Sequence, residues 1–199
     1  MIITSIVLAG KDQAQVAFPE SSLLLASHTI DGTAKLICCT WLAADESWQD
    51  SIKLSTLTKR YNLAGLKVEF IAAQQLKASD LEQQLLLTAI AQMQQYLQAE
   101  RQAFDLPLDT SLGTPFQQKV WQALLDIKHG ETISYAMLAQ NVDNPKGFRA
   151  VANANGKNPL SIIIPCHRVI ASDGKLGGYT GGLDKKQHLL ALEGVSCKL

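Results

Sequence analysis

The chain has 199 residues, and 47% of them are hydrophobic, which is enough to bury a core without disulfide or metal staples. Its formal net charge is zero, but residues 1–110 hold 8 basic against 12 acidic side chains, and residues 111–199 hold 10 against 6. The halves therefore carry about −4 and +4. This asymmetry permits a polyanion site in the second half without requiring one.

No apolar stretch approaches the roughly 18 residues of a membrane span, and Met1–Thr4 has neither the basic start nor the cleavage site of a signal peptide. The composition therefore predicts a soluble cytoplasmic protein with no membrane partner. The four cysteines, at positions 38, 39, 166 and 197, show no C-x-x-C spacing, which indicates free thiols in a reducing compartment. His28 lies near Cys38 and Cys39, so a metal site is conceivable; adjacent cysteines suit a strand better than zinc spacing, and we predict no metal.

The first half alternates short apolar runs with turn residues, which favours a small β-sheet. The expected strands are Ser5–Ala9, Gln15–Phe18, Leu23–Ile30 and Thr33–Trp41. Asp31-Gly32 is a good hairpin signal between the last two. The run Ser79–Glu82 predicts a capping box, followed by a helix with an apolar stripe that continues to about Arg101. Residues 1–105 are therefore expected to form an N-terminal α+β domain.

Residues 104–109 contain a proline in a short polar-flanked stretch and predict a linker, so that residues 106–199 form a second, mostly helical domain. Thr114, Pro115 and Gln117 supply an N-cap, a first-turn proline and a capping-box partner. The helix that they start is expected to turn Val120, Trp121, Leu124 and Leu125 inward and to stop at Gly130.

Two short helices with a tight turn between them are predicted next. Ser134 can cap a helix that runs to about Val142, residues 143–145 form the turn, and a second helix ends at Gly156. This pattern is compatible with a helix-turn-helix, although helical hairpins are common in proteins that bind no DNA. If the motif binds DNA, Lys146 and Arg149 of the second helix can face phosphates or bases.

The apolar run Leu160–Ile164 predicts a buried strand that leads directly into Pro165-Cys166-His167-Arg168. A cysteine after a β-branched run is commonly an inert core residue. Here, however, an imidazole stands beside the thiol, and a thiol with a pKa near 8.5 needs a neighbouring base to become an effective nucleophile. A turn at 165–167 or a relaying water is required for that pair to exchange a proton, and Glu193 on the last predicted helix is a candidate to orient the imidazole.

The sequence Pro165-Cys166-His167-Arg168-Val169 resembles the active-site signature of the O6-alkylguanine-DNA alkyltransferases, the methylated-DNA–protein-cysteine methyltransferases. The resemblance covers essentially all of residues 104–195. Its further segments are Gly113–Gln117 with Val120-Trp121, Gly130–Tyr135, Arg149–Val151, Asn158-Pro159, Gly178-Tyr179 and Gly181-Gly182. The first half resembles the family only in length and general character.

The resemblance implies direct reversal of O6-alkylguanine damage, with O4-alkylthymine as a second substrate, in double-stranded DNA. Each protein molecule would act once, as a monomer with no cofactor and no required protein partner. The implied catalytic residues are Cys166 as alkyl acceptor, His167 as base through a water, Glu193 as the carboxylate that orients His167, and Asn158 as a brace. The implied substrate-binding residues are Tyr135, Val169, Tyr179 and Thr180, with the carbonyl of Cys166. The implied DNA contacts are Arg149, as a finger filling the space of the extruded nucleotide, with Asn144 and Ser172 at phosphates.

Three other functions remain as alternatives. A cysteine hydrolase built from Cys166, His167 and Glu193 would turn over repeatedly. A lesion-binding protein without transfer usually lacks the cysteine, which is present here. A transcriptional helix-turn-helix protein with an incidental thiol would show a strong sequence preference, which repair does not need.

Overall fold

The computed structural model describes residues 1–8, 21–42, 47–60 and 68–197. A sheet occupies the N-terminal half, with strand order β3-β2-β1-β4. Its strands are β1 (Ile2–Leu8), β2 (Ser21–Ile30), β3 (Thr33–Leu42) and β4 (Glu69–Phe70). Asp31 and Gly32 both have positive φ and form the hairpin turn between β2 and β3, as predicted. The predicted strand Gln15–Phe18 lies outside the described residues.

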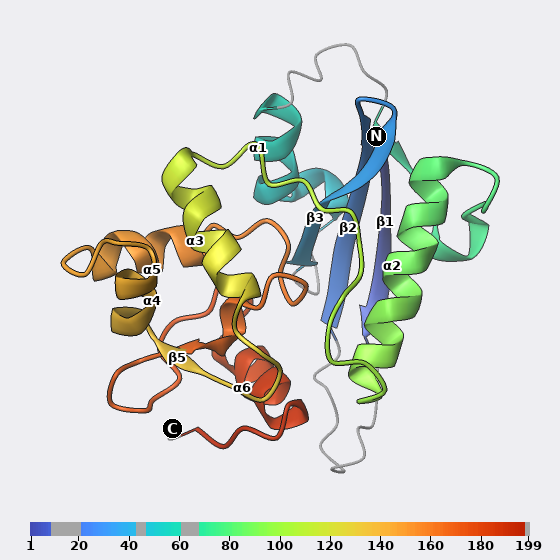
Figure 1. Ribbon diagram of the computed structural model, residues 1–199. Helices are drawn as coiled ribbons and strands as arrows, with labels where there is room; N and C mark the ends of the chain where they lie inside the picture. Colours follow the sequence, from blue (N-terminus) through green and yellow to red (C-terminus); the bar gives the residue numbers. More distant parts are fainter. Residues whose placement is uncertain (9–20, 43–46, 61–67, 198–199) are drawn as a thin grey trace.

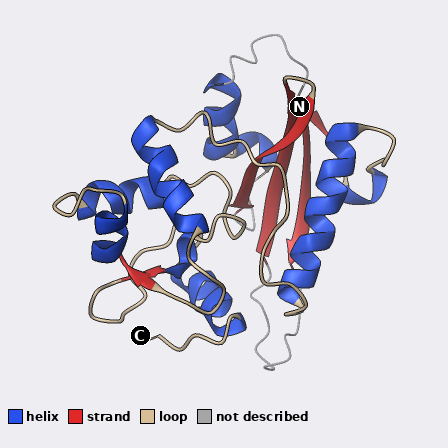
Figure 2. Ribbon diagram, viewed as in Figure 1, coloured by secondary structure: helices blue, strands red, loops and turns tan. Residues whose placement is uncertain are grey.

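Helices cover both faces of this sheet (Figures 1 and 2). On one face, Leu54 and Leu57 of α1 (Ile52–Arg60) join a core cluster with residues of β1, β2 and β3. On the other face, α2 (Leu81–Leu97) contacts β1, β2 and β3, and the same core continues into the C-terminal half. Short 3-10 helices η1 (Trp48–Asp50) and η2 (Ala73–Gln75) complete this half.

The start of α2 differs from the predicted capping box. Asp80 is the N-cap, and its side chain accepts from the Gln83 backbone N–H. Glu82 points instead to the ends of β1 and β2, where it accepts from the Thr29 N–H at 2.7 Å and lies 3.4 Å from the Met1 ammonium. The Glu82 side chain, which the local pattern assigned to the helix cap, therefore bonds to residues distant in the sequence instead.

The C-terminal half is mostly helical, as predicted, and the fold class is α+β. Its elements are α3 (Pro115–Leu125), β5 (Ile133–Ser134), α4 (Tyr135–Asn141), α5 (Phe148–Gly156), η3 (Cys166–Arg168), β6 (Val169–Ile170) and α6 (Leu183–Leu192). Thr114 and Gln117 form the predicted capping box. The helix ends at Leu125 rather than Gly130, and Leu125 is 41% exposed, so its predicted inward orientation is wrong.

The segment predicted as a linker packs along β3. The Leu36 N–H donates to the Pro107 carbonyl at 2.8 Å, and the Asp109 N–H donates to the Leu36 carbonyl at 3.0 Å. The side chain of Gln92 on α2 both donates to and accepts from the Asp105 backbone. Helix α2 ends at Leu97, ten residues before Pro107, so the proline does not stop it. The chain here is an ordered extension of the sheet edge. Within the described ranges, no helix is both long and apolar enough to cross a bilayer.

Candidate active site

The predicted strand Leu160–Ile164 is instead a buried turn. Leu160 makes an isolated bridge to Cys39 of β3, and Ser161 makes one to Ile164. Ile162 has φ +72°, a left-handed conformation that is costly for a β-branched residue. An apolar run alone does not distinguish a strand from such a turn, which explains the error.

Asn158 holds this turn closed. Its amide donates to the Ile164 carbonyl at 2.8 Å, and its oxygen accepts from the Leu160 N–H at 2.9 Å. The side chain is 1% exposed, so water does not compete for these bonds. The predicted bracing role of Asn158 therefore has a geometric basis, because the strained backbone at Ile162 persists only where neighbouring groups fix it.

The chain then enters η3, where Cys166 and His167 take different directions. Cys166 is 5% exposed and lines a cavity of about 420 Å³, which is within the range of small-molecule sites. His167 is fully buried and faces α6. Adjacent side chains of an extended strand also point to opposite faces, so the 3-10 turn does not by itself direct the thiol to the imidazole.

Three further predicted residues line the same cavity: Tyr135, Tyr179 and Thr180. Parallel pairing of β5 with β6 brings Tyr135 beside the segment that follows Cys166. The Tyr135 hydroxyl donates to the Gly178 carbonyl at 3.2 Å. Burial, and then the negative charge of Cys166, raise the pKa of Tyr135, whereas a hydrogen bond with Asn155 opposes the rise. The phenol therefore stays protonated at neutral pH and can donate.

The opposite wall is tied to the sheet and to α5. Trp41 of β3 donates to the Tyr179 hydroxyl at 3.2 Å, and the Thr180 hydroxyl donates to the Gly156 carbonyl at 2.9 Å. Val169, a predicted substrate residue, does not line the cavity; its carbonyl accepts from Lys186 at 2.6 Å. Asn155, which sequence reasoning missed, lines the cavity and donates to the Cys166 carbonyl at 3.4 Å.

His167 and Glu193 form a buried pair, with 3.0 Å between His167 Nε2 and Glu193 Oε1. Burial alone raises the pKa of Glu193, but hydrogen bonds from His167 and Arg168 hold it well below its usual range. Burial lowers the pKa of His167, although Glu193 acts in the opposite direction. The carboxylate is thus ionised and the imidazole neutral at pH 7. With Nε2 directed at Glu193, His167 Nδ1 is buried without a hydrogen-bond partner among the described residues and is the nitrogen able to take a proton.

Sequence reasoning also missed Arg168, Tyr96 and Lys186. Arg168 makes two-pronged contacts with Glu193, at 2.9 Å from Nε and 2.8 Å from Nη2, and donates to the Ile127 carbonyl at 2.6 Å. Tyr96 reaches Glu193 from α2. Lys186 did carry a signal, because it shares a helix face with Leu189, Leu190 and Glu193, all of them buried.

Lys186 is a fully buried cation that anchors the loop before α6. Its Nζ donates to the Val169 carbonyl at 2.6 Å, to the Gly178 carbonyl at 3.3 Å and to the Leu176 carbonyl. Burial lowers the pKa of Lys186 to about 8, while the negative charge of Cys166 opposes this shift. By reciprocity, the protonated ammonium favours the ionised thiol.

We expect Lys186→Met to destabilise the fold by about 1–3 kcal/mol, because several buried carbonyls lose their donor. Iodoacetamide should also alkylate Cys166 more slowly, because the thiolate loses a nearby positive charge. Chemical unfolding and peptide mass spectrometry measure the two effects. Lys175→Met is the matched control, because Lys175 lies in the loop that Lys186 anchors but its own side chain is exposed. Equal Cys166 reactivity in both variants would contradict the electrostatic role.

The predicted DNA contacts lie outside the cavity. Arg149 is exposed in the first turn of α5, with its guanidinium carbon 5.7 Å from the centre of the Phe148 ring. Phe148 is itself 51% exposed. Asn144 lies in the turn between α4 and α5, which pack against each other, and Ser172 is exposed in the loop after β6. Cys166 and its partners are thus gathered in one place, whereas Asn144 and Arg149 lie on the α4–α5 pair, Ser172 lies in the loop after β6, and none of the three lines the cavity.

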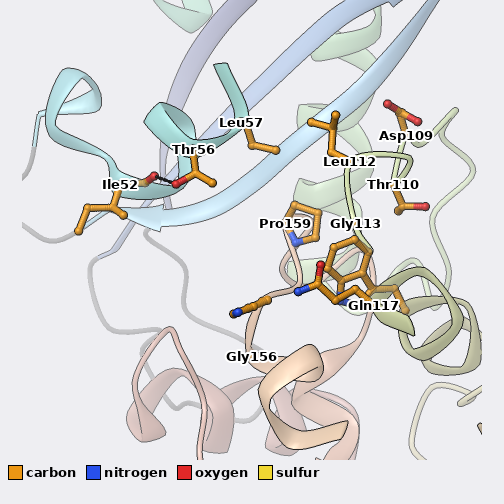
Figure 3. Close-up of a pocket in the computed structure, with 12 residues that line it drawn as sticks. Ile52, Thr56, Leu57, Asp109, Thr110, Leu112, Gly113, Gln117, Gly156 and Pro159 are labelled. Carbon is orange, nitrogen blue, oxygen red and sulfur yellow. Dashed lines mark hydrogen bonds between the residues drawn. The ribbon is translucent and has the colours of Figure 1, made fainter. Parts of the chain in front are cut away.

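A second cavity, of about 370 Å³, lies between α1, residues 109–113 and Pro159 (Figure 3). Leu57 and Leu112 extend toward it from the N-terminal helix and from the segment before α3. Neither Cys166 nor His167 lines it. Its walls are mostly apolar, and the reactive groups are in the other cavity.

Among the described ranges, no group of three or more His, Cys, Asp or Glu residues could hold a metal ion.

Together, a cavity-lining thiol, a neutral buried imidazole held by a carboxylate and an adjacent helix pair define a cysteine-nucleophile protein with a helix-turn-helix. Comparisons with known proteins agree. Residues 115–195 match the family model for the DNA binding domain of 6-O-methylguanine DNA methyltransferase. Methylated-DNA–protein-cysteine methyltransferases of Methanosarcina acetivorans and Mycolicibacterium paratuberculosis are each 51% identical to this chain, over 55% and 53% of its length and 69% and 63% of theirs.

Among solved structures, Mycobacterium tuberculosis OGT in complex with DNA is 31% identical, with a TM-score of 0.66 over 97% of this chain and 92% of that one. The O6-methylguanine-DNA methyltransferase of Pyrococcus kodakaraensis shares the fold, with a TM-score of 0.59 over 97% and 99% of the two chains at 23% identity. The chain belongs to the O6-methylguanine-DNA methyltransferase family.

Proposed function

We propose that this protein repairs O6-alkylguanine in double-stranded DNA by moving the alkyl group irreversibly to Cys166. One observation carries the proposal: the Cys166 thiol opens into a base-sized cavity while a neutral, carboxylate-held imidazole follows it in the chain. The similarity to methylated-DNA–protein-cysteine methyltransferases supports the same reaction. O4-alkylthymine is the second substrate that we propose.

The chemistry is a displacement at a saturated carbon. His167 Nδ1 takes the thiol proton, by way of a water, and the sulfur then forms a bond to the alkyl carbon. The bond between that carbon and O6 breaks, and its electron pair stays on the guanine. Tyr135, which is protonated at neutral pH, donates toward N3 of the leaving base. The product thioether has no leaving group suited to hydrolysis, so each molecule acts once.

The cavity walls supply groups that suit a flipped guanine. The Thr180 backbone N–H is proposed to donate to O6, and Tyr179 packs beside the base. The carbonyls of Cys166, which lines the cavity, and of Val169, which lies outside its lining, are proposed to accept from the exocyclic amine. The Val169 carbonyl accepts from Lys186 and has a second lone pair. The Cys166 carbonyl already accepts from Asn155 and from the Val169 N–H, so one of these two bonds has to yield when the base binds.

The α4–α5 pair is proposed to dock on the duplex, with Asn144 and Ser172 at phosphates and Arg149 filling the gap left by the extruded nucleotide. Extrusion costs on the order of a few kcal/mol, and less for a poorly paired base. We further propose that the protein acts in the cytoplasm as a monomer, with residues 1–105 and 106–199 as its two domains.

The proposed function is tested with a duplex that carries one O6-methylguanine with a labelled methyl group. We expect a single permanent methyl group on the Cys166 peptide, at one equivalent per protein molecule and without further turnover. Repeated turnover with an unmodified thiol would instead indicate a hydrolase. Binding to the lesion without transfer would indicate a recognition protein.

Arg149→Ala should slow repair of the duplex by about ten- to a hundredfold, because the cost of unstacking is no longer offset by a side chain in the gap. Transfer from free O6-benzylguanine should be unchanged, because no base has to be flipped. Single-turnover rates on the two substrates give the ratio of the duplex rate to the free-base rate, which should fall in Arg149→Ala. Arg149→Lys keeps the charge and should lie between wild type and alanine. An unchanged ratio in Arg149→Ala would remove Arg149 as the finger.

A further inference from the structure

We propose that Tyr96, on α2 of the N-terminal half, is a positioning residue for alkyl transfer that acts through Glu193. This inference rests on the proposed function and assigns the N-terminal half a part in it. The Tyr96 hydroxyl donates to Glu193 Oε1 at 2.6 Å, across 97 residues of sequence. Both side chains are buried, so water does not substitute for this bond.

Of the two Glu193 carboxylate oxygens, Oε1 has more hydrogen-bond partners. It accepts from Tyr96, from Arg168 Nη2 at 2.8 Å and lies 3.0 Å from His167 Nε2. Oε2 accepts from Arg168 Nε at 2.9 Å and from the Gly130 N–H at 3.4 Å. Tyr96 thus bonds directly to the oxygen that orients the imidazole, and it limits how strongly that oxygen can accept from His167.

Tyr96 is suited to donate at every working pH. Burial, followed by the charge of Glu193, raises the pKa of the Tyr96 phenol well above its usual value, although Arg168 opposes this. Its ring is fixed by Phe104, with ring centres 5.3 Å apart, and by the edge of His129, at 6.2 Å. Removing the hydroxyl therefore changes one hydrogen bond and leaves the ring packing in place.

The direction of the effect on His167 follows from the charges around it. Glu193 favours the protonated imidazole, whereas Arg168 and Lys186 disfavour it, and burial disfavours it most. Cys166 is the adjacent residue, and its thiol is the group from which the imidazole is proposed to take a proton. Without the Tyr96 hydroxyl, Glu193 accepts more strongly from His167, and the pKa of His167 rises. More His167 is then protonated at a given pH and less is available as a base.

The test is the pH dependence of single-turnover methyl transfer by the full-length protein, wild type beside Tyr96→Phe. We expect the acid limb of the Tyr96→Phe profile to move to higher pH by roughly half a unit, which lowers the rate on that limb by up to roughly threefold. Alkylation of Cys166 by iodoacetamide, followed by peptide mass spectrometry, should show the same shift without DNA.

Phe104→Leu is the matched control, because it loosens the packing around the Tyr96 ring without touching the hydroxyl. It should lower thermal stability and leave the pH profile in place. An unmoved acid limb in Tyr96→Phe, with normal wild-type transfer, would overturn the role of Tyr96 alone. A wild-type protein that accepts no methyl group would instead overturn the proposed function. An equal shift in Phe104→Leu would reduce Tyr96 to a packing residue.

Discussion

Replacing Cys166 with alanine is expected to abolish methyl transfer and leave duplex binding intact. The Cys166 sulfur is the only protein atom that bonds to the alkyl carbon in the proposed reaction, so no residual rate remains. The side chain is small and lines a cavity, so its loss should cost no more than about 1 kcal/mol of stability. Transfer of label from an O6-methylguanine duplex, a gel-shift titration and chemical unfolding measure these three quantities.

Cys197→Ala provides the comparison for this experiment, because Cys197 is a partly exposed thiol near the end of the chain. We expect it to transfer methyl groups at the wild-type rate. Label on a sulfur other than that of Cys166, or transfer by Cys166→Ala, would place the reaction elsewhere. Cys166→Ser should be as inactive as alanine, since a hydroxyl is far less ionised than a thiol in the same position.

Glu193→Gln is expected to produce the second large effect, on both stability and rate. Arg168 is 7% exposed and would keep its charge without a carboxylate partner, which costs about 3–5 kcal/mol. Transfer should fall by about a hundredfold or more, because His167 loses the group that fixes its orientation. Urea unfolding and single-turnover transfer measure the two effects.

The same variant has a distinct pH signature. Because the pKa of Glu193 is lowered in the folded protein, its contribution to stability is present above the ordinary value of 4.5 and is lost as the pH falls further. Glu193→Gln should lack this loss below pH 4.5. Glu82→Gln is the control, because that carboxylate contacts Met1 and Thr29 at the ends of β1 and β2, and the transfer rate of this variant should match wild type. Equal rates in Glu193→Gln and wild type would exclude the orienting role.

Local signals in the sequence predicted local structure well. Thr114 and Ser134 cap their helices through the expected side-chain bonds, and Asp31-Gly32 forms the hairpin turn. These features depend on residues within three or four positions of each other, so the sequence displays them directly. The α+β class and the family are confirmed by the comparisons. The motif around Cys166 was the sequence signal that indicated the family.

Contacts between distant segments account for what was missed. The turn at Ile162 depends on Asn158 and on a bridge to β3, and the apolar run gave no sign of either. Nothing near Arg168 in the sequence indicates that it is buried, because its partner Glu193 is supplied by the distant end of α6. Tyr96 and Glu193 are 97 residues apart, and no periodicity connects them. The roles given to the site residues remain predictions, which the variants above test.

Helix α5 links Arg149, the proposed DNA finger, to the cavity that Cys166 lines. Arg149 lies in the first turn, and Gly156, the last residue, lines the cavity and accepts from Thr180. At 1.5 Å per residue the two positions are roughly 10 Å apart along the helix axis. If Arg149 fills the gap in the duplex as proposed, this fixed length of helix sets how far a nucleotide must swing out of the stack to reach the sulfur, whatever its base identity.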